Sequence, residues 1–426
     1  MPERRARANR SAAAEPPGFP ARRSAMRLLD AVLRRGLALE AAMDAAAAGL
    51  EGPDRGLAHA IAAETLRRLP DLDALIDSAT ARPLPDDAKA RFALRIALVS
   101  ILSLGTPPHA AIATALPLVD GGPRKLVHGV LGALLRRSAT LPEIPTLPAA
   151  VAARWGANWG DADVAAAARA IAAPPPLDLT LKGGAGPVEG VSLLPGHCRL
   201  PAGTSVPATE GYAEGDWWVQ DLAASLPARM IGRGAGRALD LCAAPGGKTL
   251  QLAAAGWDVT AVDISEARLA RLRENLDRTG LSAEVVAADL LRWTPSAPAD
   301  AVLLDAPCSA TGIFRRHPDV LHRVRPALIA EMAELQARLF ARAADWVRPG
   351  GLLVYATCSL EPAEGEAQLE HFLNTRNDFA LDPILADELP DGLPTHARGW
   401  LRTRPGALAE AGGMDGFFIA RLMRVA

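Results

Sequence analysis

Residues 237–249 read RALDLCAAPGGKT, which is an apolar run short enough for a buried strand, a turn with two glycines and the start of a helix. Glycine lets the backbone of such a turn approach a ligand closely, and a helix amino terminus favours polar or anionic groups. The stretch therefore predicts a ligand-binding loop between a strand and a helix of an α/β domain.

The pattern of strand, turn and helix repeats through the rest of the chain. Further strands are expected at 259–262, 284–287, 301–304 and 352–356, and helices at 248–255, 265–278 and 326–347. Such alternation is typical of a doubly wound α/β sheet, in which ligands bind beyond the carboxyl ends of the strands. Residues 417–423 alternate weakly and predict a last edge strand.

The amino-terminal half has a different pattern. Residues 22–140 carry Leu, Ala and Ile at helical spacing with Pro and Gly breaks, which predicts a bundle of about six or seven helices. Residues 141–149 are expected to be a linker, residues 150–235 a small α+β module with a lead-in helix, and residues 236–426 the α/β domain. Residues 1–21 form a basic arm, which either contacts nucleic acid or is a solvated disordered tail.

Composition limits the class of protein. The chain has 426 residues, enough for two or three domains, and a net charge of −2 that favours no partner. Four cysteines without a C-x-x-C pair indicate neither a disulfide framework nor a metal site, and favour a reducing cytoplasm. No long apolar segment is present, so we expect neither secretion nor a membrane-spanning segment. We expect a soluble cytoplasmic protein and a monomer.

One interpretation of residues 242–249 is a phosphate-binding P-loop. Gly247-Lys248-Thr249 match the end of the motif G-x-x-x-x-G-K-[ST], and residues 301–305 could form the metal-binding strand of an ATPase. Cys242, however, stands where the first glycine of the motif belongs. A nucleotide hydrolase is therefore the second choice.

The other interpretation is a site for a nucleoside-sized ligand. Asp263 ends the second strand, 17 residues after Gly246, where a carboxylate can bind ribose hydroxyls. Asp289 follows the third strand and could accept a hydrogen bond from an adenine amino group. Either aspartate could instead cap the next helix. S-adenosylmethionine fits better than ATP, because no complete phosphate cradle is present.

Two cysteines each follow a predicted strand, Cys308 in DAPCS (305–309) and Cys358 in TCS (357–359). Strand ends of one sheet border the same crevice, so both thiols are expected to face one substrate. Thiolate addition at C6 of a pyrimidine makes C5 nucleophilic enough to attack a sulfonium methyl group; a base then removes the C5 proton and the thiol leaves. One cysteine could add and the other assist release, while Asp305 could bond the N3 and N4 edge of cytosine. Spacing does not decide which cysteine adds.

Four motifs together resemble those of the RNA cytosine-C5 methyltransferases, and within them the bacterial RsmB type, also called Sun or Fmu. They are CAAPGGKT (242–249), DAPCSATG (305–312), RRHPD (315–319) and YATCS (355–359). Residues 212–221 and 415–418 resemble the segment before that family's catalytic fold and its closing strand. The helical region 22–140 is similar to the NusB-like RNA-binding domain of the RsmB type.

The resemblance implies a Rossmann-like, S-adenosylmethionine-dependent methyltransferase acting on a cytosine of small-subunit (16S) ribosomal RNA. Cys358 matches the C6 nucleophile, and Cys308 matches the residue that releases product. The positions that match cofactor-binding residues are Cys242, Ala243, Ala244, Pro245, Gly246, Gly247, Lys248, Asp263, Asp289 and Asp305. Arg315, Arg316 and His317 are expected to hold the RNA backbone near a flipped base, or else to form an exposed basic loop.

Other functions stay open at this point. The substrate could be large-subunit ribosomal RNA or tRNA. The chain could be a P-loop ATPase, which Cys242 disfavours. It could also be a non-catalytic RNA-binding factor built on the helical region, although that hypothesis gives no reason for two thiols at neighbouring strand ends.

Overall fold

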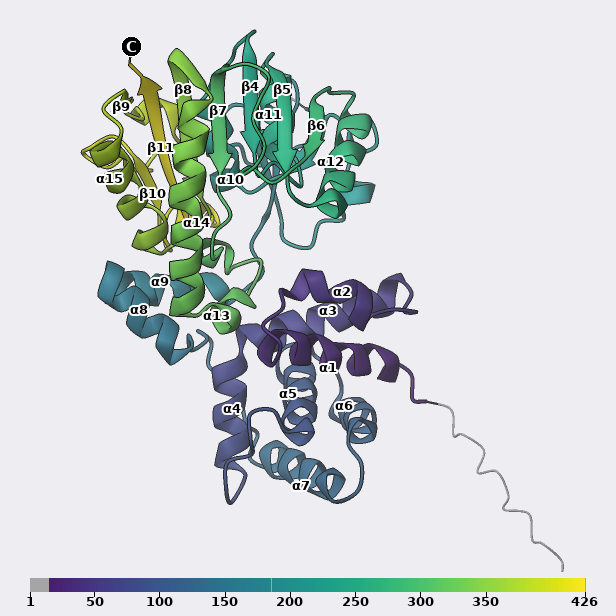
Figure 1. Ribbon diagram of the computed structural model, residues 1–426. Coiled ribbons are helices and arrows are strands. Elements are labelled where there is room, and N and C mark those ends of the chain that lie inside the picture. The colour runs from purple at the N-terminus through teal and green to yellow at the C-terminus, as the bar shows by residue number, and fades with distance from the viewer. Residues whose placement is uncertain (1–14, 185, 426) are drawn as a thin grey trace, which may run out of the picture. The chain divides into compact units, whose positions relative to one another are not determined.

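The computed structural model describes residues 15–184 and 186–425, and the chain divides into two compact units, Met1–Thr146 and Leu147–Ala426 (Figure 1). The basic arm expected at residues 1–21 falls mostly on residues 1–14, outside the described residues. The last three positions of that expected arm already belong to the first helix, which begins at Phe19.

The described part of the first unit is helical. Its elements are α1 (Phe19–Leu33), α2 (Leu39–Ala46), α3 (Gly52–Arg67), α4 (Leu69–Ser78), α5 (Lys89–Leu102), α6 (Pro108–Ala115), the 3₁₀ helix η1 (Leu116–Leu118) and α7 (Gly122–Arg136). Prolines occupy the first turns of α3, α4, α6 and α7, where the missing N–H costs nothing. Residues 90–100 of α5 are all buried, so this helix forms the centre of the bundle that the sequence predicts.

The second unit combines helices with two sheets. Its helices are α8 (Ala149–Trp159), α9 (Asp161–Ile171), α10 (Leu222–Arg229), α11 (Gly247–Ala254), α12 (Glu266–Thr279), α13 (Val320–Arg323), α14 (Pro326–Asp345) and α15 (Glu366–Thr375). Its strands are β1 (Leu177–Leu181), β2 (His197–Leu200), β3 (Trp217–Val219), β4 (Arg237–Leu241), β5 (Asp258–Asp263), β6 (Glu284–Ala287), β7 (Ala299–Asp305), β8 (Val347–Thr357), β9 (Phe379–Leu381), β10 (Leu401–Thr403) and β11 (Phe417–Arg424). Short 3₁₀ helices are η2 (Val206–Ala208), η3 (Thr311–Ile313), η4 (Pro362–Glu364), η5 (Ala386–Glu388) and η6 (Ala409–Ala411).

The main sheet has the strand order β10-β11-β8-β7-β4-β5-β6, with β9 also paired to β11. Strands β4 to β8 run parallel, and β11 is antiparallel to β8. The chain order reverses between β4 and β7, which is the place where open α/β sheets bind ligands. A smaller antiparallel sheet, β2-β1-β3, belongs to the same compact unit.

Helices cover both faces of the main sheet. On one face lie the long helix α14 and α15 (Figure 1), which share a buried cluster with Leu239 and Leu241. Within it Phe340 stacks on Tyr355 at 4.4 Å between ring centroids. On the other face α10 and α11 pack on alternate strand residues such as Leu303. Strands buried on both faces read as continuous apolar runs, and the predicted doubly wound α/β fold is confirmed.

The sequence predicts an edge strand at residues 417–423, but the structure places this strand, β11, between β10 and β8. β11 pairs with β8 on one side, and β10 and β9 lie on its other side. Residues 417–422 are consecutively buried. Alternation in the sequence is weak because both faces of this strand are covered, and an interior strand needs no polar face.

Candidate active site

The loop after β4 is fixed by the strand beside it. Ala244 N donates a hydrogen bond to Asp263 Oδ2 at 3.1 Å. Gly246 has a φ of +109°, and a Cβ there would lie 2.8 Å from Leu272 Cγ. Only glycine combines this backbone conformation with this close approach. The turn thereby starts α11 directly at Gly247, with the loop backbone at the carboxyl end of the sheet.

Asp263 and Asp289 follow the neighbouring strands β5 and β6. Asp263 is 2% exposed, because its Oδ2 accepts from Ala244 N and its Oδ1 accepts from Ser265 N at 2.9 Å. Arg268 Nη1 lies 3.4 Å from Asp263 Oδ2. Asp289 is more exposed and accepts from a backbone N–H of the turn that follows it. Asp263 therefore joins two loops of the crevice, and the cofactor contacts of both aspartates stay predictions.

Lys248 and Asp305 form an ion pair across the crevice. Lys248 Nζ lies 2.8 Å from Asp305 Oδ2 and 5.5 Å from the ring centroid of Phe417. Burial alone would lower the pKa of Lys248, but the Asp305 carboxylate outweighs burial and the pKa is raised. The ammonium group therefore stays charged and committed to Asp305.

The two thiols meet at the ends of β7 and β8. Asp305 stands opposite Ala356 in the parallel register, and Ala306 N donates to Ala356 O at 2.9 Å. This pairing brings Cys308 Sγ to 3.3 Å from Cys358 Sγ, and both thiols are free. Contact with Cys358 and burial raise the pKa of Cys308 well above its ordinary value. The pair predicted from the sequence is thus assembled, with Cys308 held as a neutral thiol.

A close approach of two glycines locks the loops that carry the thiols. Gly312 N donates to Cys358 O at 3.0 Å, and Gly416 N donates to Gly312 O at 2.9 Å. A Cβ on Gly312 would lie 1.9 Å from Gly416 O. No other residue fits at this position without separating the loops.

Arg315 and Arg316 face carboxylates inside the protein, in contrast to the expected RNA-facing or exposed loop. Arg316 Nη2 donates to Asp221 Oδ2 at 2.9 Å, and its Nε lies 3.6 Å from Asp415 Oδ2. Arg315, whose side chain is 5% exposed, lies 3.6 Å from Asp415 Oδ1. Buried carboxylates require compensating charge, and these acids, distant in sequence, supply the reason for the inward orientation. RNA contact by either arginine stays a prediction.

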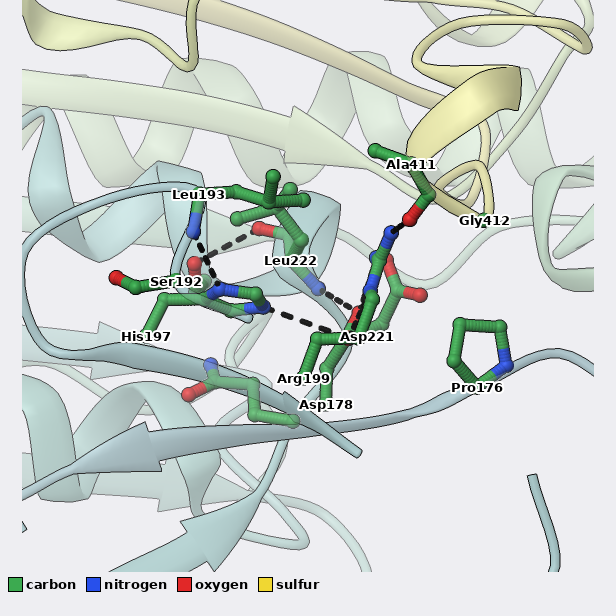
Figure 2. A network of polar contacts seen from close by, with 12 residues as sticks. Pro176, Asp178, Ser192, Leu193, His197, Arg199, Asp221, Leu222, Ala411 and Gly412 are labelled. Atoms are coloured by element: carbon green, nitrogen blue, oxygen red, sulfur yellow. Dashed lines mark hydrogen bonds and ion pairs between the residues drawn. The ribbon is translucent and has the colours of Figure 1, made fainter. Parts of the chain in front are cut away.

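A third carboxylate near Arg316 belongs to the small sheet, where Asp178 lies (Figure 2). Asp178 of β1 is fully buried and accepts from Arg199 Nε at 2.6 Å, Arg199 Nη2 at 2.8 Å and Leu222 N at 3.0 Å. Burial alone would raise the pKa of Asp178, but the hydrogen bonds from Arg199 and Leu222 N and the nearby His197, whose Nε2 is 3.4 Å away, together outweigh it, and the pKa lies well below its usual range. Asp178 therefore stays ionised beside Arg316, whose Nη2 is 3.9 Å away.

His317 follows the two anchored arginines and faces the crevice. It lines a cavity of about 450 Å³ together with Lys248 and Asp305, and Trp218 and Arg278 also line this cavity. The loop after β4 forms another wall, through residues 243–245 and 247. Anchoring of Arg315 and Arg316 thus positions His317 beside this loop and Asp305.

Two buried carboxyl groups of the site were missed by sequence reasoning. Asp240 accepts from Thr249 Oγ1 at 2.6 Å, and within the described residues its Oδ1 has no hydrogen-bond partner. Burial raises the pKa of Asp240 to about 7. A charged residue inside an apolar strand was the available signal for Asp240. Glu364 is also fully buried, and nothing in its local sequence distinguishes it from a surface turn residue.

Two other kinds of site were searched for within residues 15–184 and 186–425. No three His, Cys, Asp or Glu side chains in these ranges gather where a metal ion could bind. No helix in them has the length and apolar character needed to cross a membrane.

Comparison with known proteins gives consistent matches. Residues 233–423 match the family model described as 16S rRNA methyltransferase RsmB/F, and residues 20–138 match that of the NusB family. The chain is 34% identical to ribosomal RNA small subunit methyltransferase B of Xanthomonas campestris pv. campestris, covering 96% of this chain and 98% of the relative. It is 36% identical to the protein of the same name from Xylella fastidiosa strain Temecula1, with the same coverage. A crystal structure described as PH0851 superposes with a TM-score of 0.72 at 22% identity, over 95% of this chain and 98% of that chain, which shows a shared fold.

Replacing Arg316 by Leu should destabilise the second unit by about 3 kcal/mol, because buried Asp221 loses the cation bonded to it, while Asp178 and Asp415 keep only Arg199 and Arg315. All eight tryptophans lie in this unit, so urea denaturation followed by tryptophan fluorescence reports its unfolding alone. The matched control is Arg273→Leu, which removes an exposed pair with Glu266 and should change little. Equal effects of the two substitutions would contradict an anchoring role for Arg316.

Replacing Asp240 by Asn should raise the free energy of unfolding above that of the wild type. The difference between the two proteins should grow as the pH rises from about 4 to 7. Unfolded aspartate releases its proton near pH 4, whereas the folded chain retains the Asp240 proton to about pH 7. Between these values the unfolded state binds fewer protons, so wild-type stability falls with pH, and Asn removes this loss.

Urea denaturation of both proteins at pH 5 and pH 8 measures the difference. We expect the advantage of Asp240→Asn to be larger at pH 8 by at least about 1 kcal/mol. An advantage independent of pH would show that Asp240 is ionised in the folded chain throughout this range.

Proposed function

Since the chain belongs to the RsmB/F family of ribosomal RNA methyltransferases and is therefore a methyltransferase, we propose that it methylates C5 of a cytosine in small-subunit (16S) ribosomal RNA. The observation that carries this proposal is the pair of free thiols, Cys308 and Cys358, 3.3 Å apart beside the loop at residues 242–248. Methyl transfer to oxygen or to an exocyclic nitrogen requires no thiol, whereas C5 of a pyrimidine requires a nucleophile at C6.

The methyl donor is S-adenosylmethionine, which supplies an electrophilic methyl group on a sulfonium. Residues 242–248 and Asp305 would hold it, Asp263 would accept from the ribose hydroxyls, and Asp289 would accept from the adenine amino group. The donor set fits this molecule, because backbone N–H groups and carboxylates suit a zwitterion with a positively charged centre. A nucleoside triphosphate fits less well, because the ammonium group of Lys248 is committed to Asp305.

Cys358 acts as the nucleophile. Cys358 stands in the TCS motif at the end of β8, which matches the nucleophile position of the family that the motifs resemble. The Cys358 sulfur forms a bond to C6, C5 takes up the methyl group, and a base removes the C5 proton. The bond between Cys358 and C6 then breaks, and its electron pair returns to sulfur. Cys308, already in contact with Cys358, assists this release.

Asp305 orients the base. One of its carboxylate oxygens is bonded to Lys248, and the side chain keeps 28% of its surface exposed in the crevice. A carboxylate in this position accepts from the N4 amino group of cytosine and, when protonated, donates to N3. It thereby favours addition at C6.

The RNA contacts are divided between the two units. Residues 20–138, which match the NusB family, serve as an RNA-binding domain. The enzyme acts in the cytoplasm, where ribosomes are assembled. In the second unit, His317 lines the crevice beside a flipped base. Arg315 and Arg316 contribute to the RNA site by holding this loop in place.

Replacing Cys358 by Ala should abolish methyl transfer, and replacing Cys308 by Ala should trap a covalent protein–RNA adduct. The first change removes the nucleophile, whereas the second leaves addition intact and slows release. Each protein is incubated with unmethylated small-subunit RNA and methyl-labelled S-adenosylmethionine, and a denaturing gel shows which protein retains label.

Cys198→Ala is the matched control, because Cys198 is buried in the small sheet and should behave as wild type. Label retained by Cys358→Ala alone would reverse the two roles. No label in any protein or RNA, together with ATP hydrolysis, would replace the proposal by the nucleotide-hydrolase alternative.

A further inference from the structure

Glu364 of η4 is a buried carboxylate without an ion pair in the described part of the chain. It is 0% exposed. Its Oε1 accepts from Ser309 N at 2.8 Å and from Gln336 Nε2 at 3.2 Å. The hydroxyl groups of Ser309 and Ser359 both donate to its Oε2. In the described part of the chain, every hydrogen-bond partner of this carboxylate is therefore a neutral donor.

The two serines are the residues that directly follow the two cysteines of the site. Ser309 follows Cys308 at the end of β7, and Ser359 follows Cys358 at the end of β8. The two hydroxyl oxygens lie 3.2 Å apart, since both bond to the same carboxylate oxygen. One side chain thus connects the two loops at the positions next to the thiols.

The backbone of Glu364 is anchored to β8 as well. Its carbonyl oxygen accepts from Tyr355 Oη at 2.8 Å and from Thr357 Oγ1 at 3.1 Å. Tyr355 is fully buried, and Thr357 is the last residue before Cys358. The carboxylate consequently has a fixed location relative to the nucleophile loop, and it holds the Cys308 loop against that location.

A purely structural role does not favour a carboxylate here. Burying a carboxylate without a cation costs desolvation free energy, so a buried carboxylate normally has a counter-ion. Glu361, three positions earlier, has Arg154 at 3.0 Å. A carboxylate differs from an amide because both of its oxygens only accept. It can therefore hold the N–H and hydroxyl of Ser309, the hydroxyl of Ser359 and the amide of Gln336 at the same time.

We propose that Glu364 is a positioning residue that clamps the loops of Cys308 and Cys358 together, so that Cys308 stays in contact with the Cys358 adduct while the product is released. This inference rests on the function proposed above and assigns Glu364 to one step of it. Loss of the clamp leaves Cys358 on its own strand end, where addition still occurs. Release becomes the slow step because Cys308 is no longer held in place.

The Glu364 carboxylate also affects the protonation of Cys308. Besides the contact with Cys358 and burial, the Glu364 carboxylate contributes to the raised pKa of Cys308. The other titratable groups around the two thiols are Tyr355 from β8, Asp305 from β7 and Lys248 from α11. The clamp therefore also helps to keep Cys308 protonated until the adduct has formed.

Glu364→Gln tests the proposal, and Glu361→Gln is its matched control. Both substitutions replace a buried carboxylate of the same turn by an amide of the same size, but the carboxylate of Glu361 accepts from Arg154 and Trp155, whereas that of Glu364 accepts from the two serines. The bond from Glu361 N to Ser359 Oγ comes from the backbone and is kept in the control. The denaturing-gel assay is repeated with full-length proteins, and the fraction of enzyme in the labelled adduct is compared with the amount of methylated RNA. We expect Glu364→Gln to turn over at least about tenfold more slowly while it accumulates adduct, and Glu361→Gln to match the wild type.

A second measurement requires no catalysis. Diamide oxidises two neighbouring thiols to a disulfide by accepting two electrons and two protons, and mass spectrometry of the peptides reports the Cys308–Cys358 bond. The clamp predicts slower formation of this disulfide in Glu364→Gln than in the wild type and in Glu361→Gln. If Glu364→Gln does not fold, as judged by tryptophan fluorescence, Ser359→Ala removes one of the bonds and should give the same two effects at smaller size.

The outcomes separate this inference from the function on which it rests. Wild-type protein that makes no 5-methylcytosine rejects the proposed function, and the disulfide rates still decide whether Glu364 holds the loops. Wild-type protein that methylates, with Glu364→Gln losing activity without adduct and forming the disulfide at the wild-type rate, overturns the clamp. A Glu364→Gln protein that equals the wild type in both measurements overturns it as well.

Discussion

The parallel pairing of β7 with β8 is the constraint on which the site depends. Asp305 of β7 stands opposite Ala356 of β8, so both strands end at the same level of the sheet. Each strand is followed by a cysteine within three residues of this pair. A shift of one residue in this register would turn one thiol toward the opposite face of the sheet. The distance of 3.3 Å between the sulfur atoms is thus a consequence of the main-chain hydrogen bonds, reinforced by Gly312 and Glu364.

Carboxyl groups of the second unit are stabilised in different ways, as Asp178, Asp305, Asp240 and Glu364 illustrate. Asp178 is buried and has Arg199, and its pKa is low. Asp305 is partly exposed and has Lys248 of α11. Asp240 has one hydroxyl partner and a pKa raised to about 7, so near neutral pH its proton replaces a counter-ion. Glu364 has several neutral donors. The two acids that bear directly on the thiols and the base are therefore held by different means, Asp305 by a cation and Glu364 by neutral hydrogen-bond donors.

The fold could be predicted from the sequence because its strands are buried on both faces and its helices follow at regular intervals. The contact between Cys308 and Cys358 followed from the rule that parallel strands share their carboxyl edge. Contacts between residues distant in sequence could not be predicted in this way. The interior position of β11 depends on β9 and β10 beside it, and the orientation of Arg315 and Arg316 depends on Asp221 and Asp415. Charge alone suggested an exposed basic loop, since a local sequence does not show which acids the fold will bring near it.

The different surroundings of the two thiols give a physical basis for a division of labour between them. Equivalent thiols in contact would share one proton, and either could attack. Here the Cys308 loop meets the Glu364 carboxylate through Ser309 N, and burial and the neighbouring charge both favour its neutral form. Cys358 instead lies at the end of a strand whose neighbour carries the Lys248–Asp305 pair, and the ammonium group of Lys248 is electrostatically coupled to its sulfur. The two thiols therefore meet different neighbours, the Glu364 carboxylate on the loop of Cys308 and the ion pair of Lys248 with Asp305 near Cys358.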